Sequence, residues 1–182
     1  MDEIASQDSA VQSAAVGALS RWPDEQAADD LLRIVSSTHN REHFRAAVQG
    51  YVRLVGRSSM PAVEKLAAYE KLLALPGEDD DKKPVLAGMA AVSEPESLRL
   101  LARYLDQPAL RDAAAAALLD LAASPSPPAP WLSGHEAYSV LRRLEASLSD
   151  PAARERTGRI ILERLRQGGY VALFDGRSLD GW

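Results

Sequence analysis

Apolar residues recur along most of the chain with the 3.6-residue period of an amphipathic helix. In 95–105, for example, Leu98, Leu101, Ala102 and Leu105 fall on one face. The same pattern covers 23–36, 61–75 and 135–148, and a further helix is predicted over 151–167. Alternation typical of a strand begins only at residue 169. The pattern therefore predicts an all-α fold with a short extended C-terminal tail.

Four segments rich in small residues resemble one another, and each precedes an amphipathic segment. They are 10–19, 43–52, 83–92 and 110–119. Each is expected to pair with the segment after it into a helix–turn–helix hairpin of about 28–38 residues, as helical repeats do. We expect four to five such hairpins, the fifth opened by 151–167.

Small residues recur at one position of these segments. Gly17, Gly50 and Gly88 occupy like positions in three of them, and Ala116 or Ala117 takes that position in the fourth. A glycine inside a helix costs roughly 1 kcal/mol relative to alanine. Its recurrence in one register favours close crossings with neighbouring helices, and a merely tolerated helical glycine is the alternative.

Prolines and small polar residues mark the expected helix boundaries. A first helical turn tolerates proline, and a side-chain oxygen before a helix accepts hydrogen bonds from its free N–H groups. These rules predict first-turn prolines at Pro23, Pro61 and Pro95, N-caps at Asn40, Ser59 and Ser93, and a C-terminal cap at Gly168-Gly169. The proline-rich stretch 124–133 predicts a surface loop held to the body by Trp131, with a domain linker as the alternative.

The stretch SLRLLARYLDQPALRDAAAAALLDLA (97–122) resembles a HEAT-type repeat of the bacterial kind. The features that match are the leucine face of its first half, the turn at 106–108, then Leu110, Arg111 and a run of alanines. The resemblance implies that residues 1–168 form an α-α superhelix, a HEAT-like solenoid. Its first helices would lie on the convex side and its second helices on the concave side.

The last residues, GYVALFDGRSLDGW (169–182), resemble the opening of the 3-keto-disaccharide hydrolase family. That family begins with Leu-Phe-(Asn/Asp)-Gly-(Lys/Arg)-x-Leu-x-Gly-Trp. The matching positions here are Leu173, Phe174, Asp175, Gly176, Arg177, Leu179, Gly181 and Trp182. The resemblance implies that 169–182 begin a β-sandwich domain of a larger multidomain bacterial protein, which would carry any glycoside hydrolase-like activity. It also implies a periplasmic or extracellular location, and it places no catalytic residue on this chain.

Composition narrows the class of protein. Hydrophobic residues make up 46% of the chain and charged residues 26%, which is typical of a globular protein. No apolar run is long enough to span a membrane, and no signal peptide is apparent. The absence of cysteine excludes disulfides and thiolate zinc sites. A net charge of −5 disfavours a nucleic-acid partner.

Two polar motifs are candidates for metal chemistry. His39-Asn40-Arg41-Glu42-His43 matches H-x-x-E-H, an inverted zinc-protease motif, but Asn40 as N-cap would leave His39 outside the helix. The acidic run 78–81 lacks EF-hand spacing and suits the start of a helix. No phosphate-binding, dinucleotide-binding or nucleophile-elbow motif occurs. We therefore expect no enzyme activity, metal or cofactor in this chain.

Basic residues at outward positions of the second helices are the candidate binding site: Arg33, Lys71, Arg99, Arg103, Arg142 and Arg143. On a concave face they would form a strip able to attract an acidic protein segment or an anionic glycan. The alternative is neutralisation by neighbouring acids such as Asp29 or Glu70. The sequence thus favours a non-enzymatic scaffold or protein-binding module, with a structural appendage that positions a carbohydrate-active domain as the alternative.

Overall fold

The computed structural model describes residues 9–123 and 130–167, and all regular structure in these ranges is helical. This confirms the all-α prediction. The odd-numbered helices are α1 (Ser9–Arg21), α3 (Arg41–Arg57), α5 (Asp79–Ala90), α7 (Arg111–Ala123) and α9 (Pro151–Gln167). The even-numbered helices are α2 (Ala27–Ser37), α4 (Ala62–Leu73), α6 (Pro95–Arg103) and α8 (His135–Ser147). Two short 3-10 helices are η2 (Tyr104–Asp106) and η3 (Pro130–Ser133).

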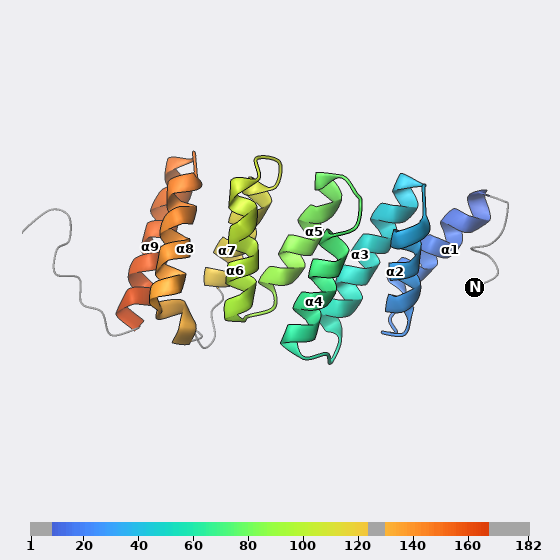
Figure 1. Ribbon diagram of the computed structural model, residues 1–182, viewed down its shortest axis with the longest axis horizontal. Coiled ribbons are helices and arrows are strands. Elements are labelled where there is room, and N and C mark those ends of the chain that lie inside the picture. Colours follow the sequence, from blue (N-terminus) through green and yellow to red (C-terminus); the bar gives the residue numbers. More distant parts are fainter. Residues whose placement is uncertain (1–8, 124–129, 168–182) are drawn as a thin grey trace, which may run out of the picture.

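The helices stack along the long axis of the molecule in two rows (Figure 1). The odd-numbered helices form the first row, in which α1, α3, α5, α7 and α9 each contact the next. The even-numbered helices form the second row and lie in front of the first in Figure 1. None of the described helices is long and apolar enough to cross a membrane.

Three second-row helices, α2, α4 and α8, pack more extensively against the first-row helix that follows them than against the one before, and α6 packs about equally on both. Thus α2 packs chiefly on α3, and α8 chiefly on α9. The most closely packed pairs are therefore offset by one helix from the hairpins expected from the sequence. Helical periodicity cannot reveal this offset, because it shows which face of a helix is apolar but not which neighbour covers it.

One continuous core runs through the stack from Val16 in α1 to Ile161 in α9. Leucine and alanine supply most of it, and Leu31, Leu86 and Leu118 are fully buried. Tyr69 is also fully buried, and its hydroxyl donates a hydrogen bond of 3.3 Å to the Val52 carbonyl. This shared core makes the described helices one packed body rather than separate hairpins.

The expected close crossings occur at two of the three glycines. A Cβ on Gly50 would lie 2.7 Å from the Ser20 Cα, and one on Gly88 would lie 2.9 Å from the Val52 side chain. At Gly17 the prediction is wrong: among the described residues, a Cβ would meet only the Arg21 guanidinium, at 3.6 Å. In α7 the buried residue is Ala117, whereas Ala116 is exposed.

Helix boundaries follow the expected residues in part. Asn40 caps α3, with its side chain accepting from the Glu42 and His43 N–H groups, and Pro95 opens α6. Pro23 lies outside α2, because the Asp24 carboxylate accepts from the Gln26 N–H and holds a separate turn ahead of the helix.

Ser59 and Ser93 are not N-caps. The cap positions belong to Pro61 and Glu94, neither of which makes a side-chain capping bond. The Ser59 N–H instead donates to the Glu25 carboxylate, which ties two neighbouring loops together.

Only the end of the proline-rich stretch 124–133 lies within the described residues. Its last four residues form η3, and Trp131 packs against the core as predicted. Residues 124–129, Gly168-Gly169 and the tail 169–182 lie outside the described residues.

Candidate functional site

The second row carries the basic side chains predicted to bind a partner. Arg33 lies on α2, Lys71 on α4, Arg99 and Arg103 on α6, and Arg142 and Arg143 on α8. All six are exposed, as their outward positions predict. We refer to this surface of α2, α4, α6 and α8 as the second-row face.

Five of these six side chains form ion pairs. Within helices, Arg33 pairs with Asp30 at 2.8 Å and Arg142 pairs with Glu145. Between helices, Arg103 approaches Glu70 at 3.7 Å, Arg143 pairs with Asp106, and Arg99 binds Glu136 at 2.6 Å. Lys71 forms no ion pair with the described residues. Acidic residues therefore neutralise these five arginines. The sequence named Glu70 and Asp29 as such acids; Glu70 does pair with an arginine, whereas Asp29 forms none of these ion pairs.

The pairs between helices link three members of the second row. Glu70–Arg103 joins α4 to α6, while Arg99–Glu136 and Asp106–Arg143 join α6 and η2 to α8. Arg99 engages both carboxylate oxygens of Glu136 and also binds Glu96. These hydrogen bonds raise the pKa of Arg99 and lower the pKa of Glu136. The second-row face therefore carries several ion pairs and is not uniformly basic.

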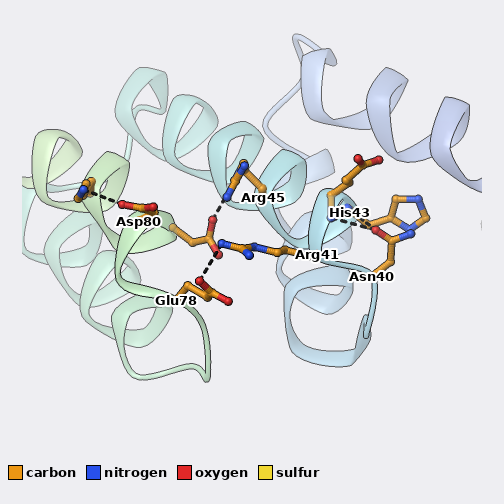
Figure 2. Close-up of polar contacts among 9 residues, drawn as sticks. Asn40, Arg41, His43, Arg45, Glu78 and Asp80 are labelled. Carbon is orange, nitrogen blue, oxygen red and sulfur yellow. Dashed lines mark hydrogen bonds and ion pairs between the residues drawn. The ribbon is translucent and has the colours of Figure 1, made fainter. Parts of the chain in front are cut away.

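A polar cluster lies where the N-termini of α3 and α5 meet (Figure 2). It brings together the two motifs that the sequence singled out, 39–43 and 78–81. Arg41 binds Glu78 at 2.7 Å, and Arg45 donates through Nε to Asp81 at 3.0 Å. Asp81 is buried, and Arg45 is its partner from the neighbouring helix. The cluster joins α3 to α5 at this edge of the stack.

The histidines of this cluster do not assemble a metal site. His39 precedes α3, as expected if Asn40 is the cap, and the buried His43 lies 2.9 Å from the Ser13 hydroxyl of α1. Figure 2 shows His43 directed away from Glu78 and Asp80. No group of three or more metal-ligating side chains occurs within 9–123 and 130–167. The acidic run of α5 instead meets cations: Lys83 binds Asp80 at 2.6 Å and thereby lowers the pKa of that carboxyl.

A mostly apolar hollow of 260 Å³ lies at the C-terminal end of the stack. Its described lining is Ser133, Gly134, His135, Tyr138 and Leu165. Leu165 lies two residues before the end of α9, so the hollow is beside the point where the chain continues to residue 168.

Sequence reasoning missed Arg164, a charged residue that is almost completely buried. Its guanidinium donates to the Ala122 carbonyl at the C-terminal end of α7, at 3.0 Å from Nε, and to Gln167. The sequence does hold one indication of this burial, because Arg164 falls on the apolar stripe of α9, next to Ile161 and Leu165.

Comparisons with protein-family models, with curated proteins and with solved structures find no match to this chain.

Proposed function

We propose that this chain is a non-enzymatic scaffold of the HEAT-like α-solenoid type, which holds a partner protein on the second-row face. The supporting observation is the two-row stack with one continuous core, which leaves the outward side of four successive helices exposed. Solenoids use such extended faces for binding. The ion-paired arginines give that face a fixed pattern of alternating charge, which favours a partner of mixed charge over a simple polyanion.

Site-specific photo-crosslinking tests the choice of face. Ala67 is exposed on α4, one turn before Glu70, and Ala87 is exposed on the first-row helix α5. A photoreactive residue at each position, in the longest natural form of the protein, should give a discrete adduct from position 67 and none from 87. Excess unlabelled chain should suppress the adduct, and so should the Arg103→Glu/Arg142→Glu double variant. Equal labelling from both positions, or none, would contradict the proposal.

A structural appendage is the second candidate, and the apolar hollow at the C-terminal end favours it. A neighbouring domain docked there would cover Tyr138, which is 37% exposed, and Leu162, which is 47% exposed. The resemblance of 169–182 to a carbohydrate-active domain makes such a neighbour the natural occupant.

Hydrogen exchange distinguishes this second candidate from the first. Amides of 134–138 and 162–165 should exchange more slowly in a longer protein that contains the downstream domain than in the 182-residue chain. Identical exchange at these amides in both proteins would rule out docking at the hollow.

A further inference from the structure

Apolar side chains remain uncovered around the hollow at the C-terminal end of the stack, where α8 and α9 form the last helix pair (Figure 1). Tyr138 lines the hollow and is 37% exposed, and Leu162, one turn before Leu165, is 47% exposed. These are two of the five exposed large hydrophobic residues in the described ranges. Inside a stack the following helix covers such side chains, so a different element is needed to cover them at its end.

The hollow lies next to the apolar core. A smaller space shares Tyr138 and Leu165 with the hollow, and the rest of its lining includes the buried Leu132, Leu141 and Ile161. An apolar side chain seated in the hollow would therefore extend the core. The volume of 260 Å³ is below the roughly 300–1,000 Å³ of small-molecule pockets, so a protein segment suits the hollow better than a small ligand.

The chain leaves α9 beside this hollow. Leu165 lines the hollow, and α9 ends two residues later at Gln167. The last turn of α9 is held in place, because the Arg164 guanidinium donates to the Gln167 side chain at 2.8 Å and to the Ala122 carbonyl of α7 at 3.0 Å. The chain therefore continues from a fixed point next to the hollow.

The sequence that follows α9 matches the hollow in chemistry and in reach. Residues 168–169 are glycines, which adopt backbone conformations closed to other residues and so allow the chain to turn back. The next five residues, 170–174, read Tyr-Val-Ala-Leu-Phe, and no charge occurs between Arg166 and Asp175. An apolar surface needs an uncharged occupant, since a buried charge would lose its hydration without compensation. Two glycines span roughly 7 Å when extended, so residues 170–174 carry the first side chains able to reach the hollow.

We propose that residues 170–174 of this chain seat in the hollow and cover Tyr138 and Leu162, which closes the C-terminal end of the stack. The inference rests on the second candidate function for its docking surface, and it names the occupant, which lies within the chain itself. The segment thereby fixes the start of a downstream domain against α8 and α9. A folded domain after it would hold the segment in place and add to the protection of the hollow.

Disulfide trapping in the 182-residue chain tests the occupant. The chain has no cysteine, so His135→Cys/Ala172→Cys introduces one thiol at the hollow and one in the middle of the segment. Arg166→Cys/Ala172→Cys is the control, because residue 166 is nearer to the segment along the chain but does not line the hollow. Under mild oxidation, the 135/172 pair should form an intramolecular disulfide several-fold faster than the 166/172 pair.

Hydrogen exchange provides a second readout that needs no thiol. Leu173→Asp places a charge in the segment and alters none of the described residues, so the amides of 134–138 and 162–165 should exchange several-fold faster than in the wild-type chain. Leu179→Asp makes the same change outside the segment and should leave the exchange of these amides unchanged.

The outcomes separate this inference from the second candidate function. A 166/172 disulfide that forms as fast as the 135/172 disulfide would overturn the inference, as would unchanged exchange in Leu173→Asp. A 135/172 disulfide formed between two chains would assign the hollow to a second copy and would also overturn it. If Leu173→Asp has no effect but exchange slows in a longer protein, another part of the downstream domain docks there, and only the second candidate function stands. Docking of the segment with no further slowing in the longer protein would show the reverse.

Discussion

At the level of single residues, three helical glycines in like sequence positions experience different surroundings. Gly50→Ala should lower the free energy of unfolding by about 1–3 kcal/mol, because its Cβ would press on the backbone of Ser20. Gly17→Ala should raise it by up to about 1 kcal/mol, since alanine favours the helix and only a flexible arginine is near. Urea unfolding of both variants checks the difference in sign. Equal effects at the two positions would refute the close crossing at Gly50.

Tyr69 links stability to alkaline pH. Burial raises its pKa from 10.0 to about 12, so the folded state resists ionisation where the unfolded state ionises freely. The stabilisation is complete below about pH 10 and is lost as pH rises through about 12. Tyr69→Phe should remove this pH-dependent contribution to the free energy of unfolding, which is on the order of 2–3 kcal/mol at most. Urea titrations at pH 8 and 11 should show a smaller loss for the variant; parallel losses would contradict the assignment.

The residues that the sequence predicted correctly are those with local signals. Asn40 begins a helix with its side chain two residues from the N–H it caps, and Trp131 is a large apolar group in a polar stretch. Asp81 and Arg164 were not predictable in this way, because their partners lie 36 and 42 residues away. Only the fold brings such groups together.

At the level of helices, basic side chains repeatedly satisfy the C-terminal carbonyls of neighbouring helices. Arg53 of α3 donates to the carbonyls of Ser20 and Trp22, and Arg164 of α9 donates to Ala122. The last carbonyls of a helix have no partner within it, and a cation there also meets the negative end of the helix dipole. These contacts tie one first-row helix to the next.

Arg164→Met should therefore loosen α9 from α7. Removing a buried charged donor leaves the Ala122 carbonyl without that partner, and we expect a loss of about 1–3 kcal/mol in the free energy of unfolding. Arg166→Met is the matched control in the same helical turn, and as an exposed residue it should change stability by no more than about 0.5 kcal/mol. Chemical denaturation measures both; similar losses would show that the Arg164 contact is dispensable.

Helix positions were predictable because each helix carries its own apolar stripe, and the observed bounds of α6, α8 and α9 lie close to the predicted ranges. The start of α2 was not predictable in this way, because Asp24 directs the chain into a turn after Pro23. The pairing of helices was not predictable either, because an apolar stripe does not identify its neighbour.

At the level of the whole molecule, the second-row face shows which features of a surface can be predicted from composition and residue spacing. Outward positions of the six basic residues followed directly from periodicity. Their partners did not, since Arg99–Glu136 and Arg143–Asp106 each span 37 residues. The acid and the base of each pair lie on different helices, so the pairing is visible only once the helices are stacked.

Both the ion pairs between helices and the apolar core could determine the shape of the stack. Exposed pairs contribute about 0.2–1 kcal/mol each, and the first row packs directly from α1 to α9, so the core should dominate. Arg99→Glu should lower stability, and Arg99→Glu/Glu136→Arg should restore most of it, with a coupling that shrinks as salt rises. The Arg33–Asp30 pair, confined to α2, is the matched control for charge reversal without a link between helices. The radius of gyration from small-angle scattering should stay the same in all these variants. An expansion in Arg99→Glu that the double variant reverses would instead show that the ion pairs set the curvature of the stack.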